Sequence, residues 1–202
     1  MPEDVHDDAH GTELSEMDVR VRALETILTE KGYVDPAALD RIVEAFETRI
    51  GPHNGTRIVA RAWTDPEFKQ RLLENGTAAC DELGIAMGPT KLVVVENTPR
   101  IHNLIVCTLC SCYPRMVLGL PPDWYKSRAY RARAVREPRA LLAEFGTAIP
   151  EGVAIRVHDS TAVVRYLVLP LRPEGTESLG EDELAGLVTR DSMIGVAVVK
   201  RP

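Results

Sequence analysis

The sequence predicts an α+β fold: an N-terminal helical arm, then a mixed β-sheet core flanked by helices, with a cysteine-rich loop directly after a core strand. Three observations lead to this prediction. Apolar residues recur at helical spacing in the first third of the chain. From residue 91 onward, short β-branched runs replace that pattern. Helical segments then alternate with strand-like runs, so the body of the chain is expected to contain both kinds of element.

The arm is expected to span residues 15–52. It follows a tail at residues 1–14 that is acidic, has almost no apolar content and is expected to be disordered. Two helices are expected in the arm, because apolar side chains recur there every three or four residues. The start signals are Ser15 and Asp35-Pro36, and the stop signals are Gly32 and Gly51-Pro52.

Residues 53–202 are expected to form one metal-binding catalytic domain. Its expected elements alternate between helices and short strands. In chain order they are a helix from Asp65-Pro66 to Gly76, strands at 91–96 and 103–107, helical segments within 121–146 with Asp123 as a cap and Pro138 as a break, strands at 153–157 and 163–170, a helix at 180–190 and a last strand at 194–200.

Composition narrows the classes of partner. The 202-residue chain is 45% hydrophobic, carries a formal charge of −6 and has a pI near 5.4, which disfavours a nucleic-acid or anionic-membrane partner. No apolar run has membrane-spanning length, and the acidic start is unlike a secretory leader. We therefore expect a cytoplasmic protein, in which thiols stay reduced and serve metal binding or catalysis rather than disulfides.

Three of the four cysteines lie within residues 106–113, in the string VCTLCSCY. A structural zinc site or an iron–sulfur cluster needs a fourth ligand, and Cys80, His102 and His158 are not at ligand spacing from this cluster. Another reading is a planar set of two sulfurs and two backbone nitrogens from Cys110-Ser111-Cys112, with Cys107 on the axis and one position open. Because two amides would be deprotonated, that set suits a trivalent ion such as cobalt(III) or iron(III) rather than zinc.

The segment VCTLCSCYPRMVLGLPPDWY resembles the metal-binding loop of nitrile hydratase α subunits. The resemblance extends to GPHNGTRIVARAWTDPEFKQRLLENGTAAC, VVVENTPRIHNLIV, YRARAVREPRALLAEFG and LVTRDSMIGV, and it covers about residues 15–198. Members of this family hydrate a nitrile to its amide, so the resemblance implies an enzyme subunit with a nitrile substrate.

The resemblance also implies roles for the loop. Thr108 after the first cysteine is typical of the cobalt enzymes, which implies one non-corrin Co(III) per chain. Cys107 would be the axial thiolate, Cys110 a sulfinate and Cys112 a sulfenate, with Ser111 and Cys112 supplying the amide nitrogens. The metal would act as a Lewis acid on the nitrile or on water, and metal-bound hydroxide and the sulfenate both stay open as nucleophile.

Partners follow from the same resemblance. A β-type subunit would complete the active site and contribute two arginines to the oxidised sulfurs, and an activator protein would load the metal. Without its partner the chain is expected to have little activity and to self-associate over exposed apolar surface. The basic segment 126–139 is expected to be a solvated or partner-facing helix face.

Other positions are assigned from their place in the family pattern. Arg115 stands where nitrile hydratases typically have tryptophan, and in this it resembles the γ subunit of thiocyanate hydrolase, whose substrate is an anion. Val163 stands where an acidic residue is common. These departures suggest a polar or nucleoside-like nitrile. The pocket candidates are Arg115 and Trp124, and the expected supporting residues around the metal are Thr108, Tyr113, Asp159 and Arg165.

Two alternatives remain at this point. One is the metal subunit of a thiocyanate-hydrolase-like enzyme. The other is a non-catalytic zinc or metal-carrier module that uses the same thiols. Cys80, far from the cluster, is expected to be a buried small hydrophobe.

Overall fold

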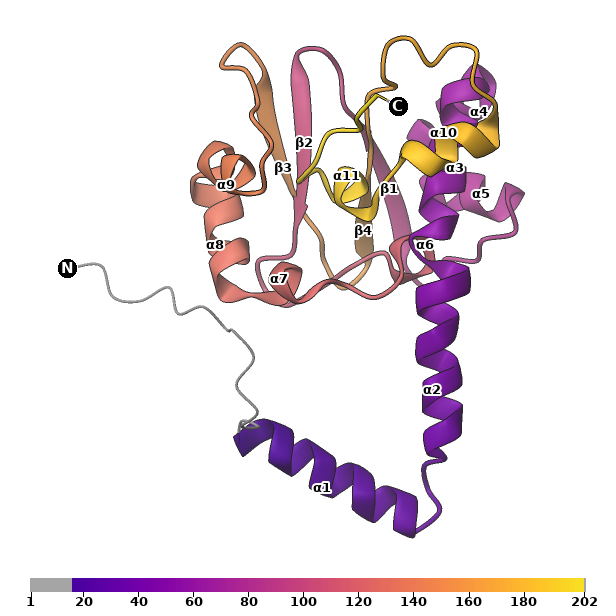
Figure 1. Ribbon diagram of the computed structural model, residues 1–202, viewed down its shortest axis with the longest axis vertical. Helices are drawn as coiled ribbons and strands as arrows, with labels where there is room; N and C mark the ends of the chain where they lie inside the picture. The colour runs from indigo at the N-terminus through magenta and orange to yellow at the C-terminus, as the bar shows by residue number, and fades with distance from the viewer. Residues whose placement is uncertain (1–15, 202) are drawn as a thin grey trace, which may run out of the picture. The chain divides into compact units, whose positions relative to one another are not determined.

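The computed structural model describes residues 16–201, and it confirms the α+β class (Figure 1). The chain divides into two compact units, residues 1–43 and residues 44–202. The predicted tail at 1–14 and the cap at Ser15 lie outside the described residues. The predicted limit of the arm at residue 52 stays a prediction.

The first unit contains α1 (Glu16–Glu30) and α2 (Pro36–Ala45) up to Val43, as the start signals predicted. Gly32 stands in the turn between them with a φ of 69°, a conformation that glycine adopts without strain. Neither helix has a buried residue, and Met17, Leu24 and Ile42 are each about half exposed or more.

The second unit begins with the π-helical turn η1 (Phe46–Ile50), followed by α3 (His53–Thr64), α4 (Pro66–Glu74) and α5 (Gly76–Glu82). The sequence did not predict α3, whose Ile58, Val59 and Ala60 are fully buried. Asp65 caps α4 as predicted, since its carboxylate accepts from the Phe68 amide at 3.0 Å. This helix ends at Glu74, two residues before the predicted stop at Gly76. Gly76 starts the unpredicted α5, because Asn75 caps that helix through the Ala78 amide.

Four strands form the sheet layer: β1 (Lys91–Glu96), β2 (Ile101–Val106), β3 (Ala154–Asp159) and β4 (Val164–Leu169). All four were predicted, and β1 has the predicted bounds. The expected single mixed sheet is corrected to two parallel pairs, β1 with β4 and β2 with β3. The pairs meet where β2 lies against β4. Leu104, Ile105, Leu167 and Leu169 are 0–1% exposed, so the core is centred on these strands.

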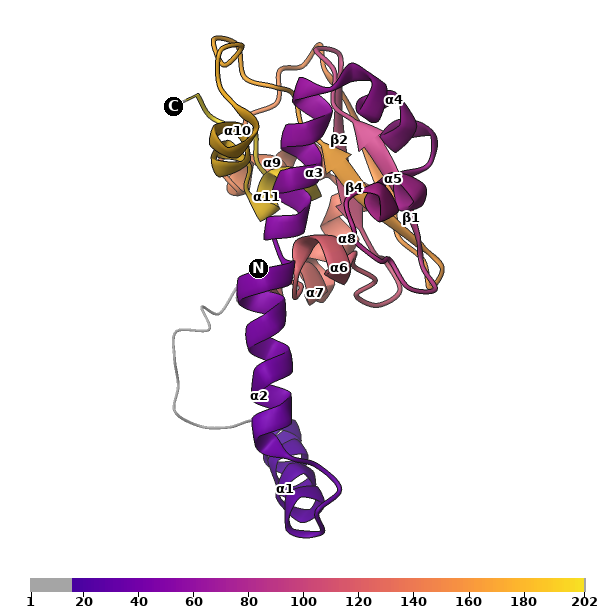
Figure 2. The ribbon, with the colours of Figure 1, turned by 90° about the vertical axis from the view of Figure 1, so that its right-hand side faces the viewer.

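The remaining helices surround the strands. They are α6 (Arg115–Leu118), α7 (Asp123–Lys126), α8 (Arg128–Arg136), α9 (Pro138–Glu144), α10 (Glu181–Leu187) and α11 (Arg190–Ile194). Figures 1 and 2 show α8 and α9 on the side of β2 and β3, while α3 to α5 and α10 lie on the side of β1. Pro138 separates α8 from α9 as predicted. Asp123 is not a cap, because Pro122 holds that position and the Asp123 carboxylate pairs with Lys126 at 2.7 Å.

The prediction of a last strand at 194–200 is wrong. Ile194 ends α11, and the segment after it is irregular in structure. Its carbonyl groups find side-chain partners instead of a strand: His102 Nε2 bonds the Gly195 carbonyl at 2.7 Å, and Thr147 donates to that of Val196 at 2.7 Å. Gly195 has a φ of 95°, and a Cβ there would stand 2.0 Å from the Asn103 oxygen, so only glycine fits this close approach.

None of the helices between residues 16 and 201 has the length and apolar character needed to cross a membrane.

Candidate metal centre

The cysteine loop begins where β2 ends at Val106 and runs to the start of α6 at Arg115. The parallel register of β2 and β3 places Val106 opposite Asp159. The Ser160 amide donates to the Val106 carbonyl at 2.7 Å, which continues the ladder one residue further. The loop therefore starts from a rigid sheet edge with an acidic side chain beside it.

The loop gathers its three thiols into one group. The Sγ atoms of Cys107, Cys110 and Cys112 all lie within 4.8 Å of one another. The Cys110 sulfur is 3.6 Å from that of Cys107 and 3.4 Å from that of Cys112, and the Cys110 amide donates to the Cys107 sulfur at 3.4 Å. Cys107 is buried, whereas Cys110 is exposed and Cys112 is half-buried. Soft thiolates in this arrangement are ligands for a transition metal.

The close approach of the sulfurs shifts the pKa values of Cys110 and Cys112 in opposite directions. Hydrogen bonds from the Cys112 and Cys107 thiols, with smaller help from nearby amides, lower the pKa of Cys110. Burial, together with the neighbouring thiols, raises the pKa of Cys112 to about 12. Of these two thiols, Cys110 is therefore the more acidic.

Asp159 holds the first half of the loop with both carboxylate oxygens. Its Oδ1 accepts from the Thr108 amide at 2.9 Å, and its Oδ2 accepts from the Thr108 hydroxyl at 2.5 Å. Arg131 on α8 donates to the Thr108 carbonyl at 3.3 Å. Asp159 therefore holds the amide and hydroxyl of Thr108, and Arg131 holds its carbonyl. These two side chains come from elements that are distant in sequence.

The second half of the loop rests on aromatic side chains of α7 and α8. The Tyr125 hydroxyl, on a fully buried side chain, donates to the Cys112 carbonyl at 3.0 Å. Tyr113 meets the Tyr125 ring edge-on, with 5.0 Å between ring centroids. Trp124 packs edge-on against Tyr130 and Phe145, each at 4.9 Å. These contacts form a rigid base under the cysteines.

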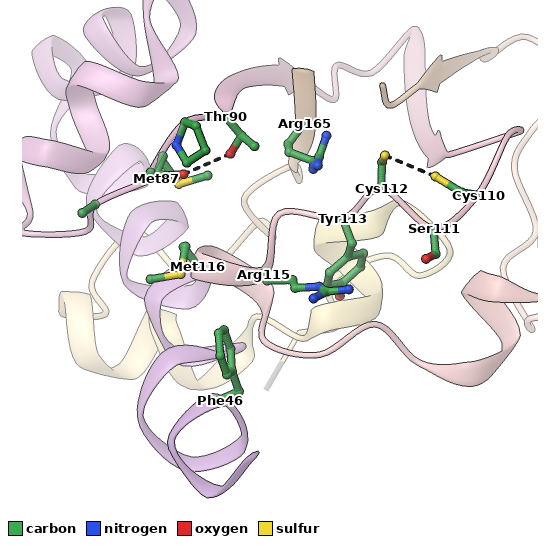
Figure 3. A pocket seen from close by; sticks show the side chains of 13 residues that line it. Phe46, Met87, Thr90, Cys110, Ser111, Cys112, Tyr113, Arg115, Met116 and Arg165 are labelled. Carbon is green, nitrogen blue, oxygen red and sulfur yellow. Dashed lines mark hydrogen bonds between the residues drawn. The ribbon is translucent and has the colours of Figure 1, made fainter. Parts of the chain in front are cut away.

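A cavity of about 600 Å³ opens beside Cys110, Ser111 and Cys112 (Figure 3). The thiols lie at one end, and the thioethers of Met87 and Met116 lie at the other. The lining is mainly apolar and includes the following residues: Phe46, Ala86, Gly88, Pro89, Thr90, Tyr113, Arg115 and Arg165. This volume and lining are typical of a site for a small organic molecule.

The predicted site residues do not all meet at this cavity. Cys110, Ser111, Cys112, Tyr113, Arg115 and Arg165 line it, and Cys107 lies beneath them. Thr108 and Asp159 support the loop from behind. Trp124 is not among the lining residues and instead belongs to the aromatic base. Val163, where the family pattern often has an acid, is 62% exposed.

Sequence reasoning missed Tyr125 and the segment 86–90 that forms one wall. Tyr125 carries no motif of its own, and its hydrogen bond to the loop depends on the path of the chain between α6 and α7. The string MGPT looked like a turn and nothing more. Cys80 is buried in α5 as expected, and burial raises the pKa of its thiol to about 12, so it stays protonated.

The fold and the thiol group define an α+β chain with a cysteine loop at a sheet edge that could hold a metal ion. The family described as nitrile hydratase, alpha chain, matches residues 15–197, and the chain therefore belongs to this family. The resemblance identified from the loop and the flanking segments is confirmed.

Individual relatives agree with this assignment. The chain is 56% identical to the low-molecular weight cobalt-containing nitrile hydratase subunit alpha of Rhodococcus rhodochrous, over 93% of this chain and 91% of that protein. It is 43% identical to the thiocyanate hydrolase subunit gamma of Thiobacillus thioparus, over 93% of this chain and 82% of that protein. A solved double mutant of the Fe-type nitrile hydratase from Comamonas testosteroni Ni1 superposes with a TM-score of 0.86 at 46% identity, covering 95% of this chain and 94% of that one.

Proposed function

We propose that this chain is the metal-bearing α subunit of a cobalt nitrile hydratase, which adds water to a nitrile and yields the amide. The observation that carries the proposal is the group of three thiols on one loop, beside a cavity of about 600 Å³. Membership of the nitrile hydratase alpha-chain family supports the reaction class. The cobalt-containing relative from Rhodococcus and the threonine at position 108 support the choice of metal.

The donor set fits a trivalent ion better than a structural zinc ion. Within residues 16–201 no fourth thiol, imidazole or carboxylate joins the three sulfurs, whereas structural zinc takes four ligands. We propose that Cys107, Cys110 and Cys112 bind one non-corrin Co(III) through sulfur, with the backbone nitrogens of Ser111 and Cys112.

A bound Co(III) would supply Lewis acidity toward a nitrile nitrogen or a water oxygen. The chain itself supplies the rest of the site. Met87, Met116 and Phe46 bind the organic part of the substrate and exclude water from it. We further propose that an external oxidant, such as molecular oxygen, converts the Cys110 thiol to a sulfinate and the Cys112 thiol to a sulfenate, whose oxygens accept protons or hydrogen bonds. Arg165 lies near enough to stabilise charge on Cys112.

The proposal is tested by cobalt content and intact mass on one purified sample. We expect one cobalt per chain and three added oxygens, two located on Cys110 and one on Cys112 by peptide mapping, with Cys107 unmodified. A chain expressed without cobalt should show unmodified thiols. Zinc at one per chain with no added oxygen, in a sample prepared with ample cobalt, would support the metal-carrier alternative and contradict the proposal.

A second candidate function is supported by the charge in the cavity. Arg115 and Arg165 both line it, and two guanidinium groups suit an anionic or strongly polar substrate. The similarity to the thiocyanate hydrolase subunit gamma of Thiobacillus thioparus adds weight to that alternative. Product analysis separates the two functions: an amide arises from a nitrile, whereas carbonyl sulfide and ammonia arise from thiocyanate.

Replacing Arg115 with tryptophan is expected to shift substrate preference toward simple aliphatic nitriles. No described carboxylate lies within ion-pair distance of Arg115, so its charge is available to a substrate. Loss of one charged hydrogen bond of about 1.5 kcal/mol should change the ratio of kcat/KM values between an aliphatic and an anionic nitrile at least about tenfold. Steady-state kinetics with both nitriles measures the ratio.

Two matched variants control that experiment. Arg115→Lys keeps the charge and should keep most of the preference for the anionic nitrile. Arg57→Trp places tryptophan at an exposed arginine outside the cavity and should leave the ratio unchanged. An unchanged ratio in Arg115→Trp, with only a modest loss of stability, would mean that Arg115 has no role in substrate choice.

A further inference from the structure

The hydroxyl of Tyr125 makes a buried contact with the backbone of the cysteine loop. The Tyr125 side chain is 0% exposed and belongs to the short helix α7. Its hydroxyl donates to the carbonyl of Cys112 at 3.0 Å. A buried phenol needs a hydrogen-bond partner, and here that partner is the backbone of a residue in the thiol group.

The backbone around Cys112 has few other constraints. Residues 111–114 have no regular secondary structure, and among the described residues no backbone amide donates to the Cys112 carbonyl. Asp159 and Arg131 hold the loop at Thr108, which is four residues away. Closer to the thiols, the Tyr113 carbonyl accepts from the Arg115 amide at 2.9 Å, and the bond from Tyr125 holds the Cys112 carbonyl itself.

The direction of this constraint matters for the thiols. The Cys112 carbonyl and its side chain leave the same short backbone segment, so fixing the carbonyl limits the directions in which Sγ can point. The Cys112 sulfur stands 3.4 Å from that of Cys110. A change in the Cys112 backbone would therefore alter the spacing of these two sulfurs.

We propose that Tyr125 is a positioning residue for the cysteine loop, which holds Cys112 in a ligand-ready orientation before a metal arrives. The effect of Tyr125 on metal retention rests on the proposed function. Its effect on the order of the loop backbone is a property of the metal-free chain. Tyr125 itself touches neither substrate nor metal in this account. It acts through the backbone of Cys112.

The chain offers two matched tyrosines for comparison. Tyr130 is also buried, and its hydroxyl donates to a backbone carbonyl at 2.6 Å, but that carbonyl belongs to Ile105 within strand β2. Tyr113 is 4% exposed, and its hydroxyl has no described partner. The three changes to phenylalanine therefore remove the same atom with different consequences: a bond to the loop, a bond to a strand, or no bond.

The experiment compares the three phenylalanine variants in the metal-free chain and in the cobalt-loaded protein. In the metal-free chain, hydrogen exchange of the amides at 110–113 and alkylation of Cys112 should both become at least about tenfold faster in Tyr125→Phe, since about 1.4 kcal/mol corresponds to a factor of ten. In the loaded protein, the rate of cobalt loss to a chelator should rise by a similar factor.

The two control variants make the result specific. Tyr130→Phe should lower the melting temperature as much as Tyr125→Phe does, yet leave loop exchange and cobalt loss within about twofold of the parent chain. Tyr113→Phe should change neither loop measurement. Because Tyr130→Phe loses the same kind of buried bond, it shows what a merely structural loss does.

Each outcome decides between the explanations. Equal loop exchange in Tyr125→Phe and Tyr130→Phe would overturn the positioning role. Faster loop exchange in Tyr125→Phe, in a chain that never retains cobalt, would support the positioning role and overturn the proposed function instead. Tyr125→Phe and Tyr130→Phe both preserve side-chain volume, so both are expected to fold, which circular dichroism checks before either rate is compared.

Discussion

Replacing Cys107, Cys110 or Cys112 with serine should remove cobalt retention and nitrile hydration together. A hydroxyl is a hard donor that stays protonated at neutral pH, so each change removes one thiolate from the set. Changes to residues that merely support a metal ligand already cost about 10- to 100-fold in affinity or activity, and loss of a ligand should cost more. Elemental analysis and amide production, measured on the same sample, test this prediction.

Cys80 supplies the matched control for this series. It is fully buried in α5, away from the loop, and serine there should cost about 1–3 kcal/mol of stability because a hydroxyl replaces a core thiol. Cobalt content per folded chain should stay normal in Cys80→Ser. Near-normal turnover in Cys112→Ser would show that the sulfenate has no catalytic role, and the proposed site chemistry would then be wrong.

The isolated chain is expected to have at least about 100-fold less activity than the chain combined with a β-type partner. The isolated chain lacks the hydrogen-bond donors that the partner would contribute, and loss of such donors at a reacting centre typically has an effect of this size. The cysteine loop is accessible to a partner, because the Leu109 side chain is 88% exposed and Cys110 is also exposed. A partner would cover these groups, contribute arginines to the oxidised sulfurs and complete the cavity wall.

Adding the partner to the purified, cobalt-loaded chain tests this expectation directly. Activity should rise with the fraction of complex, measured by size-exclusion chromatography with light scattering. The chain alone should self-associate, because apolar side chains such as Leu24 and Ile27 are about half exposed. Full turnover from the monomeric chain would contradict the need for a second subunit. An activator protein that loads cobalt is a further proposed partner, and its omission should lower cobalt content rather than complex formation.

Much of the local structure could be predicted from the sequence, because the signals are short-range. Asp65 caps α4 through an amide three residues away, and Pro138 breaks a helix at its own position. The run 91–96 became β1 with the predicted bounds. The same reasoning failed at 194–200, where a β-branched run of strand-like composition finds side-chain partners for its carbonyls rather than a neighbouring strand.

In the candidate site, too, some features follow from short-range spacing in the sequence and others depend on tertiary packing. The identity of the thiol donors followed from the spacing of Cys107, Cys110 and Cys112, because ligands two and three residues apart can reach one ion without help from the fold. The role of Asp159 was expected only from family resemblance, and its two hydrogen bonds to Thr108 depend on the pairing of β2 with β3. A parallel register between strands about fifty residues apart is set by packing of the core, not by either strand alone.

The sequence by itself therefore indicated which thiols are available to a metal, most of the helices, all four strands and the family to which the chain belongs, but it missed α3 and α5 and wrongly added a strand at 194–200. Only the tertiary structure decided that the strands form two parallel pairs, that Arg115 and Arg165 share a cavity with Cys110 and Cys112, and that the Tyr125 hydroxyl holds the loop. The physical reason is the range of the interactions. Caps, turns and ligand spacing act over a few residues, whereas register, cavities and buried hydrogen bonds exist only once distant segments pack together.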